Sequence, residues 1–583
     1  MRRNKFLTWL LSTLCLGALS FGIACGESGM TSGNGSENSV QSNDESSENL
    51  VESSSIADNS SVVDGSIVSE SSQELIDSSE EVSIEAVESS EEIIESSEEV
   101  ESSEEIENES REGLEYTLSD DGTYYSVTGI GTCMDTEIVI ASQYKDLPVT
   151  SIGDSAFSNC SNLTEVVIGN SVTSIGGYAF SDCSSLTEVV IPDSVTSIGY
   201  QAFSGCSSLT KVVIPDSVTS IGGSAFSGCS SLTKVVIPDL VTSIGMSAFS
   251  FCGGLTEVVI GNSVTSIGGS AFYYCSSLTE IVIPDSVKNI GDSAFSNCSS
   301  LTEVVIPDLV TSIGGSAFFG CSSLTKAEIG NSVRSIGDSA FSNCSSLTEV
   351  VIPDSVTSIG MSVFSNCSSL TSINIGENNT AYQSIDGNLY SKNGKTFIQY
   401  AIGKTATRFV IPDSVTSIGG YAFSNCSSLT EVVIPDSVTS IGMSVFSNCS
   451  SLSEVAIGNS VKNIGDSAFS NCSSLTEIVI PDSVTSIGGY AFSNCSSLTE
   501  AVIGDSVTSI GMSAFYFCDR LTGVVIGNSV TSIGNNAFYY CRSLTRLEFK
   551  GTVEEWNAFA KDSNWMYDVP ATEVVCNNGK AEL

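Results

Sequence analysis

The sequence predicts a β-rich solenoid, an elongated stack of short repeated units, and two observations point to it. A 23-residue unit recurs along most of the 583-residue chain, and one copy runs from Leu186 to Ser208. A unit this short cannot bury its own apolar face, so its copies must stack on one another. Cysteine also returns at one fixed place in sixteen copies: Cys160, Cys183, Cys206, Cys229, Cys252, Cys275, Cys298, Cys321, Cys344, Cys367, Cys426, Cys449, Cys472, Cys495, Cys518 and Cys541.

Residues 1–25 have the pattern of an export signal. Basic residues at Arg2, Arg3 and Lys5 precede an apolar run that ends near residue 23. The segment 22–25, Gly-Ile-Ala-Cys, resembles a bacterial lipoprotein box, in which Cys25 would carry the lipid. Gly22 departs from that box, where an aliphatic residue is usual, and it also fits ordinary secretory cleavage. We therefore expect a cell-surface protein anchored by lipid to the membrane, with plain secretion or a retained membrane anchor as alternatives.

Residues 26–112 differ in composition from everything that follows. They contain 26 acidic residues, with Arg111 as the only basic one, and many serines. Such a segment has too little apolar surface to offset the entropy lost on ordering, and its like charges repel. The composition predicts a disordered tether, with a docking segment or weak calcium binding as lesser alternatives.

Residues 113–148 are expected to form an N-terminal cap. Short strands are predicted at 124–127 and 137–140, before the repeats begin at residue 149. A cap is needed because the first unit would otherwise expose its core to water.

The first half of each unit in 149–372 and 411–547 alternates between apolar and outward residues. In the copy quoted above, Leu186, Val189 and Ile191 are predicted to point inward, whereas Glu188 and Val190 point outward. Successive copies should pair as parallel strands of one continuous sheet. The strand should end at the next residue, because that position is Pro or Gly and proline cannot donate to the ladder.

The second half of the unit returns the chain to the start of the next one. Val195 and Ile198 are predicted to point inward, and Ala202, Phe203 and Cys206 should close the unit with about one helical turn. Cysteines in register point the same way, which favours a buried ladder of free thiols over scattered disulfides. No Cys-x-x-Cys pair occurs, so a metal site is the weakest interpretation and no cofactor is expected.

The cysteine spacing changes once, where 59 residues separate Cys367 from Cys426. The segment 373–410 contains Asp386-Gly387 and Asn393-Gly394 between alternating apolar runs, a strong hairpin pattern. We expect a β-hairpin island that projects from the solenoid, which resumes in phase after it.

Residues 548–583 are predicted to form a C-terminal cap. Thr552 and Glu555 have the spacing of a capping box at a helix start. Trp556, Phe559 and Trp565 can then cover the last unit.

The composition argues against two functional classes. A formal charge of -47 excludes a nucleic-acid partner, because phosphate binding needs Lys and Arg clusters. The chain contains no histidine, which removes the usual general base and the common nucleophilic triads. We therefore expect no enzyme activity, although an active site within the island is a minor alternative.

The repeat resembles that of the BspA-like leucine-rich repeat proteins over about residues 114–576. The shared pattern is Leu-x-x-Val-x-Ile-Pro-x-x-Val-x-x-Ile-Gly-x-x-Ala-Phe-x-x-Cys, as in residues 186–206. The resemblance implies a leucine-rich-repeat solenoid, with a parallel sheet on one face and helical turns and extended segments on the other. It also implies an exported bacterial surface protein, since some members are adhesins for matrix proteins or other cells.

The outward strand positions form two rows that are candidates for ligand binding. The valine row is a candidate contact surface on an exposed sheet, although recent duplication of one β-favouring residue would also produce it. Beside it runs a charged row in which Lys211 and Lys234 interrupt glutamates. The candidate residues are Val190, Val213, Val236 and Val259 with Glu188, Lys211, Lys234 and Glu257.

A third candidate surface is aromatic. The turn before the repeat cysteine carries aromatic residues in a few copies: Tyr273, Tyr274, Tyr516, Phe517, Tyr539 and Tyr540. These are candidate contacts or packing residues.

We expect a tethered adhesion protein that binds extracellular proteins or glycans on host or neighbouring cells through its extended face. The alternative is a structural or spacer protein of the envelope without a dedicated ligand, which the uniformity of the repeats favours.

Overall fold

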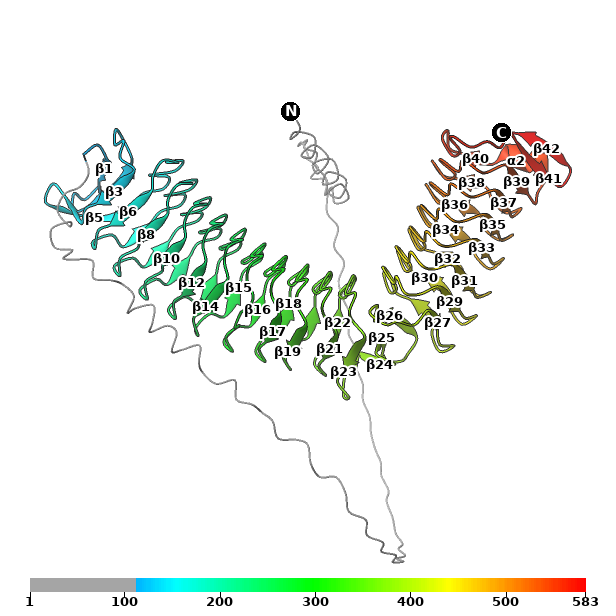
Figure 1. Ribbon diagram of the computed structural model, residues 1–583, viewed down its shortest axis with the longest axis horizontal. Helices are drawn as coiled ribbons and strands as arrows, with labels where there is room; N and C mark the ends of the chain where they lie inside the picture. The colour runs from blue at the N-terminus through cyan, green and yellow to red at the C-terminus, as the bar shows by residue number, and fades with distance from the viewer. Residues whose placement is uncertain (1–111) are drawn as a thin grey trace, which may run out of the picture. The chain divides into compact units, whose positions relative to one another are not determined.

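Each repeat forms one turn of the solenoid. It consists of a short strand, a corner, a second very short strand and a series of turns. The computed structural model describes residues 112–583. The predicted export signal and, apart from Glu112, the predicted acidic tether lie outside these residues. Figure 1 shows successive turns of the chain standing side by side. The predicted solenoid with parallel sheets is confirmed.

The first strand of each turn carries the Glu-Val-Val-Ile pattern. Leu186, Val189 and Ile191 are buried and Glu188 and Val190 are exposed, as predicted. Equivalent strands pair in parallel without a shift, so that Val189 lies beside Val166. These strands are β3 (Glu137–Ile140), β6 (Glu165–Ile168), β8 (Glu188–Val190), β10 (Lys211–Val213), β12 (Lys234–Ile237), β14 (Glu257–Ile260), β17 (Glu303–Ile306), β19 (Lys326–Ile329), β21 (Glu349–Ile352), β23 (Ser372–Ile375), β27 (Arg408–Val410), β29 (Glu431–Ile434), β31 (Glu454–Ile457), β33 (Glu477–Ile480), β35 (Glu500–Ile503), β37 (Gly523–Ile526), β39 (Arg546–Phe549) and β41 (Glu573–Cys576).

The second strand of each turn contains the Ser-Ile or Asn-Ile pair. Ile198 is buried in it, as predicted, and Val195 is buried just before it. These strands are β5 (Leu147–Ile152), β7 (Ser174–Ile175), β9 (Ser197–Ile198), β11 (Ser220–Ile221), β13 (Ser243–Ile244), β15 (Ser266–Ile267), β16 (Asn289–Ile290), β18 (Ser312–Ile313), β20 (Ser335–Ile336), β22 (Ser358–Ile359), β28 (Ser417–Ile418), β30 (Ser440–Ile441), β32 (Asn463–Ile464), β34 (Ser486–Ile487), β36 (Ser509–Ile510), β38 (Ser532–Ile533) and β40 (Ala560–Lys561).

The prediction of one continuous sheet on the first strands is wrong. Within residues 112–583 the first strands divide into several sheets, and residues 279–283 form no strand. The longer sheets are built on the second strands, with 13 strands up to β22 and 10 strands from β24 to β40. Extra amides extend the second ladder: Thr196 N donates to Thr173 O at 2.9 Å, and Gly199 N to Ile175 O at 2.8 Å. In copies such as 186–208 the first strand ends in proline instead, which cannot donate to the previous turn.

The return segment is not the predicted helical turn. Gln201 and Gly205 have φ angles of 54° and 76°, and equivalent residues in other copies are also left-handed. Gly and Asn tolerate this conformation best, which explains their frequency before the repeat cysteine. The turn also bonds to the next copy, since Phe203 N donates to Ala225 O at 2.7 Å.

A column of buried phenylalanine rings runs through the core beside the turns. Phe249, Phe272 and Phe295 are fully buried and nearly parallel, with ring centroids 5.5 and 5.4 Å apart. The glycine after the Ile of most second strands lets the turns approach this closely. A Cβ on Gly222 would lie 2.5 Å from the backbone carbon of Gly199, so no other residue fits.

The repeat cysteines form the predicted ladder of free thiols. All cysteines among residues 112–583 are free. The Cys206 thiol donates to Phe180 O at 3.2 Å, and burial raises its pKa to about 12. Cys160, in the first copy, is only partly buried, and a hydrogen bond with the Cys183 thiol lowers its pKa.

Both ends of the described array are covered. At the N-terminal end β1 (Glu115–Leu118) pairs antiparallel with β2 (Tyr125–Gly129), which pairs in parallel with β5. A short strand β4 (Gln143–Tyr144) also pairs with β5. The Tyr116 and Tyr144 rings stack at 4.0 Å. The predicted strand at 137–140 is present as β3.

At the other end the helix α2 (Val553–Ala558) follows the predicted capping box. Glu555 N donates to Thr552 Oγ1 at 3.2 Å, and Thr552 N donates to Glu555 Oε2 at 2.8 Å. Trp556 is buried against Phe549, and Trp565 contacts Phe538 of the last repeat. The strand β42 (Gly579–Glu582) pairs with β41. The predicted aromatic cover of the last turn is confirmed.

The island contains the predicted hairpins but does not project from the solenoid. Strand β24 (Tyr382–Ile385) pairs antiparallel with β25 (Asn388–Ser391), which pairs with β26 (Thr396–Gln399). Strand β26 then pairs in parallel with β28, so the island continues the second ladder. The Phe397 ring stacks on Phe423 at 4.6 Å, because the apolar residues of the island enter the core.

The core is divided at the island. Leu389 and Ala401 pack with the repeats before it, whereas Tyr390, Phe397 and Tyr400 pack with those after it.

Among residues 112–583 we find no helix with the length and apolar character needed to cross a membrane.

We expect Cys160 to be the most reactive repeat thiol, because it is the least buried and its pKa is lowered. Replacing Cys160 with Ser should remove one fast-reacting thiol when the full-length protein is titrated with Ellman's reagent at pH 8. The control Cys206→Ala should leave the fast phase unchanged. A fast phase that is unaffected by Cys160→Ser would contradict the expectation.

We expect Phe272→Ala to destabilise the array by about 3–5 kcal/mol, because a fully buried ring is replaced by a cavity between two other rings. Urea unfolding followed by circular dichroism measures this change. The control Met246→Ala, at a side chain that is 64% exposed, should leave the unfolding midpoint nearly unchanged. Equal unfolding midpoints for the two variants would show that the column of phenylalanine rings does not stabilise the array.

Candidate functional site

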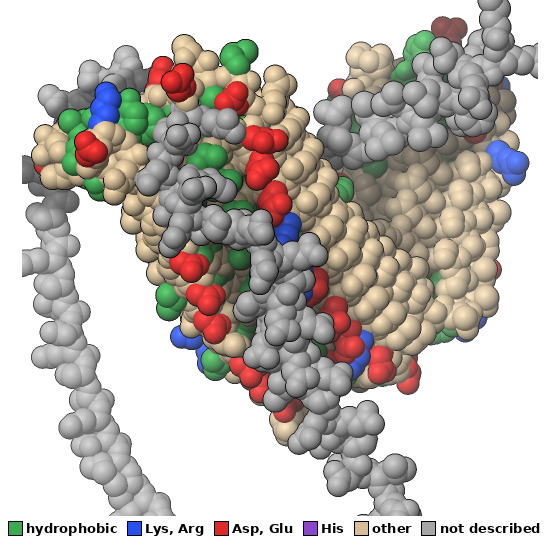
Figure 2. Space-filling view, turned by 60° about the vertical axis from the view of Figure 1, so that its left-hand side comes forward, with side chains coloured by type: hydrophobic (Ala, Val, Ile, Leu, Met, Phe, Trp, Pro, Cys, Tyr) green, Lys and Arg blue, Asp and Glu red, His purple; other side chains and the backbone are tan. Residues whose placement is uncertain are grey.

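The candidate site is the outward face, which we define as the solvent-facing side chains of the first strands. It consists of three parallel rows contributed by a Thr, a Glu or Lys, and a Val of each repeat. Figure 2 shows acidic side chains arranged in a row across successive turns, with apolar side chains beside them. The rows exist because strand side chains alternate and the copies pair in register.

The valine row is exposed where the sequence predicts it. Its members occupy the same position in successive turns, and all but Val282 among those given below lie on first strands. The exposed fractions are 54% for Val190, 54% for Val213, 36% for Val236, 63% for Val282 and 49% for Val305. Val167 and Val259 are half-buried, and Glu328 interrupts the row between Val305 and Val351.

The charged row contains ion pairs between neighbouring turns. Lys234 Nζ lies 2.6 Å from a Glu257 carboxylate oxygen. Lys326 contacts both Glu303 at 2.8 Å and Glu328 at 2.5 Å. Hydrogen bonds to Glu303 and then to Glu328 raise the pKa of Lys326 above its usual range.

Lys211 stands apart in the charged row. It lies between Glu188 and Lys234 in register, and no ion pair within the described residues joins it to Glu188. The two lysines therefore form a positive spot in an acidic row.

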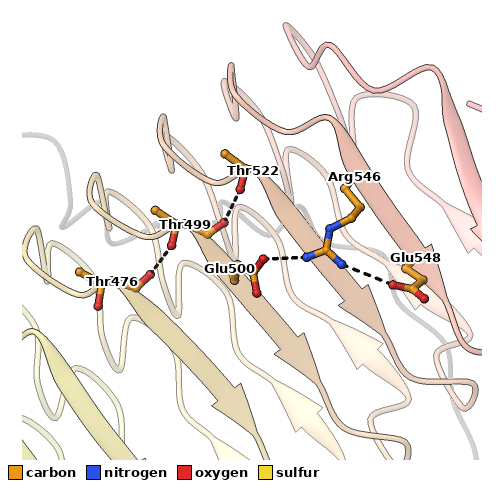
Figure 3. Close-up of polar contacts among 6 residues, drawn as sticks. All are labelled: Thr476, Thr499, Glu500, Thr522, Arg546 and Glu548. Atoms are coloured by element: carbon orange, nitrogen blue, oxygen red, sulfur yellow. Dashed lines mark hydrogen bonds and ion pairs between the residues drawn. The ribbon is translucent and has the colours of Figure 1, made fainter.

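Arg546 makes a contact that the sequence analysis missed. Its guanidinium reaches across Gly523 to Glu500, two turns away, at 2.8 Å, and also contacts Glu548 at 3.5 Å (Figure 3). Gly523 has no side chain at this position, and a Cβ there would lie 2.5 Å from Arg546 Nη2. The glycine at position 523 could have indicated this contact, because its missing side chain leaves space between Glu500 and Arg546 in the charged row.

The threonine row is fixed by hydrogen bonds. Thr499 Oγ1 donates to Thr476 O at 3.0 Å, and Thr522 Oγ1 donates to Thr499 O at 3.1 Å (Figure 3). The same contact recurs in the first half, where Thr187 Oγ1 donates to Thr164 O at 3.0 Å. Because most of these hydroxyls bond to the previous turn, most of the row is held in place before any ligand binds.

The structure brings the eight predicted site residues together on strands β8, β10, β12 and β14. All lie on the outward face, but their role in binding stays a prediction. Cys25, the predicted lipidation site, lies outside the described residues. No group of three or more Cys, Asp or Glu side chains within residues 112–583 is arranged to hold a metal ion.

The aromatic residues of the third candidate surface lie on the turns, away from the outward face. Tyr274 is 44% exposed and packs against Phe251, with ring centroids 5.6 Å apart. Near the C-terminal cap the Tyr516, Tyr539 and Tyr567 rings form a stack with spacings of 5.4 and 5.0 Å. These rings mainly pack on one another.

These features define a leucine-rich-repeat solenoid with a flat, exposed strand face. The family model described as "BspA type Leucine rich repeat region (6 copies)" matches residues 150–279, 265–394, 402–522 and 462–566. The chain belongs to this BspA-type leucine-rich repeat family, as the sequence resemblance indicated. A comparison with curated proteins gives no match.

Two solved structures of leucine-rich proteins are similar to this chain. A leucine-rich cell surface protein from Faecalibacterium prausnitzii is 29% identical, covers 78% of this chain and 98% of its own, and has a TM-score of 0.42. A leucine-rich repeat protein from Bacteroides ovatus is 30% identical, covers 76% of this chain and 99% of its own, and has a TM-score of 0.47.

Proposed function

We propose that this protein is a non-catalytic adhesion or ligand-binding protein that is displayed on the cell surface. The observation that carries the proposal is the valine row: apolar side chains about half exposed on neighbouring strands. Exposed apolar side chains in a contiguous row are typical of protein contact surfaces. The expected partners are proteins or glycans on host or neighbouring cells.

The rigidity of the outward face supports the proposal. Most of the threonine hydroxyls are already bonded and the strands are locked in register, so little side-chain order has to be gained on binding. The charged row beside the valines contributes specificity, and Lys211 with Lys234 forms its positive spot.

Anchoring by a lipid on Cys25 would place the repeats at the membrane surface, with the Ser/Glu-rich segment as the tether. The alternative, a spacer without a ligand, is favoured by one observation: most outward positions of the first half repeat the same residue.

We expect the triple variant Val190→Lys, Val213→Lys and Val236→Lys to weaken binding at least about tenfold, since it replaces apolar contact surface with charge. The measurement is saturable binding of the full-length protein to a panel of purified host matrix proteins and to a glycan array.

The matched control is Thr196→Lys, Thr219→Lys and Thr242→Lys, which adds the same charge to neighbouring turns at the second strands. Equal affinity of the two triple variants would remove the valine row as the binding surface. Absence of saturable binding by the unmodified protein to every member of both panels would favour the spacer function.

A further inference from the structure

One turn in the middle of the array lacks the hydrogen bonds that the others make to the next turn. In an ordinary turn three alternate amides donate forward along the stack. Ser339 N donates to Met361 O at 2.9 Å, and Phe341 N donates to Val363 O at 3.0 Å. Asn343 N completes the set with a bond to Ser365 O at 2.8 Å.

The next turn carries the same three donors without acceptors. The amides of Ser362, Phe364 and Asn366 have no hydrogen-bond acceptor within residues 112–583. The cause is the island: after Cys367 the chain enters strands β23 to β26 instead of forming another turn at this place. Edge donors of this kind are a template for pairing with another chain.

The island covers only part of this edge. Ile359 N donates to Tyr382 Oη at 3.0 Å, so a tyrosine hydroxyl stands in for the next turn. Met361 N donates to Asp338 Oδ1 at 2.7 Å, as equivalent residues do elsewhere. Only these three amides therefore lack an acceptor, whereas the other amides named here keep their hydrogen bonds.

A cavity of about 210 Å³ lies at this gap. Ser362 and Phe364 line one wall, and Leu389, Ile398 and Gly419 line the other. The site thus combines backbone donors with an apolar wall, and unpaired donors next to apolar surface are costly unless a partner satisfies them.

The molecule shows what satisfies these donors elsewhere. In ordinary turns the acceptors are alternate carbonyls of the next turn, such as those of Gly223, Ala225 and Ser227, and the middle residue is small. At the last repeat a segment outside the repeat pattern does the same.

That segment belongs to the C-terminal cap. Asn536, Phe538 and Tyr540 donate to the carbonyls of residues 564, 565 and 567 at 3.1, 2.8 and 2.9 Å. Donors at these three positions therefore also bond to carbonyls of a segment that is not a repeat.

We propose that this cavity binds a peptide segment of a partner protein that takes the place of the missing next turn. The peptide presents alternate carbonyl oxygens to Ser362 and Phe364 in the cavity and to Asn366 beside it, as the next turn does in the other repeats. The cavity is smaller than the roughly 300–1,000 Å³ of drug-sized pockets, so the residue facing Leu389 and Ile398 is small and apolar. This site is separate from the valine row and does not depend on the proposed function.

Amide hydrogen exchange of the full-length protein tests the proposal. The probe is the peptide Gly-Gly-Ser-Ala-Phe-Ser-Gly, which has the sequence of residues 222–228. Without peptide, the amides of Ser362 and Phe364 should exchange faster than those of Ser339 and Phe341. With millimolar peptide, exchange at Ser362 and Phe364 should slow by about tenfold, because the new hydrogen bonds close the edge.

Two controls separate the site from non-specific binding. A peptide with Trp in place of Ala is too large for the cavity and should not slow exchange. The variant Gly419→Leu should abolish the peptide effect by filling the cavity; a Cβ there comes no nearer than 3.3 Å to Phe397 O. Gly253→Leu, where a Cβ meets only Ser276 Oγ at 3.6 Å, should bind normally.

The proposal is overturned if Ser362 and Phe364 exchange as slowly as Ser339 and Phe341 in the free protein. It is equally overturned if the peptide leaves their exchange unchanged, because the cavity then holds only water. Substituting the valine row should not change the exchange of Ser362 and Phe364. The proposal for the cavity and the proposal for the valine row are therefore tested independently.

Discussion

The structure depends on the pairing of each turn with the next in an unshifted register. Three sets of contacts enforce that register: parallel strand pairs, turn amides such as Phe203 N to Ala225 O, and the stacked phenylalanine rings. A slip of one residue would turn each strand's apolar side chains to solvent. The rows of the outward face, the thiol ladder and the close glycine contacts all follow from this one constraint.

Much of the fold could be predicted because equivalent residues of successive repeats occupy the same structural environment. Alternation in the first strand located Val189 in the core and Val190 outside it, and the capping box at Thr552 identified the helix of the C-terminal cap. The second ladder was harder, since a two-residue strand such as Ser197–Ile198 shows no alternation. Its continuity depends on amides outside the strand, at Thr196 and Gly199, which no residue pattern marks.

The island shows the other limit of repeat-based reasoning. Its turn residues identified the hairpins, but Phe397 and Tyr400 occupy core positions that the repeat pattern assigns to other residues. Similarly, the position of the candidate site followed from strand alternation, whereas the reach of Arg546 over Gly523 depended on side-chain length and an empty neighbouring position. The ligand itself is not encoded by the repeat, because a scaffold that copies one surface carries little information about what binds it.

The division of the core at the island has a mechanical consequence. Leu389 and Tyr390 are consecutive residues, yet they pack into different apolar clusters. Where the ring column and the turn bonds are interrupted together, the load between neighbouring rungs is shared by fewer contacts. Under tension applied through the two ends, the array should yield first at this joint.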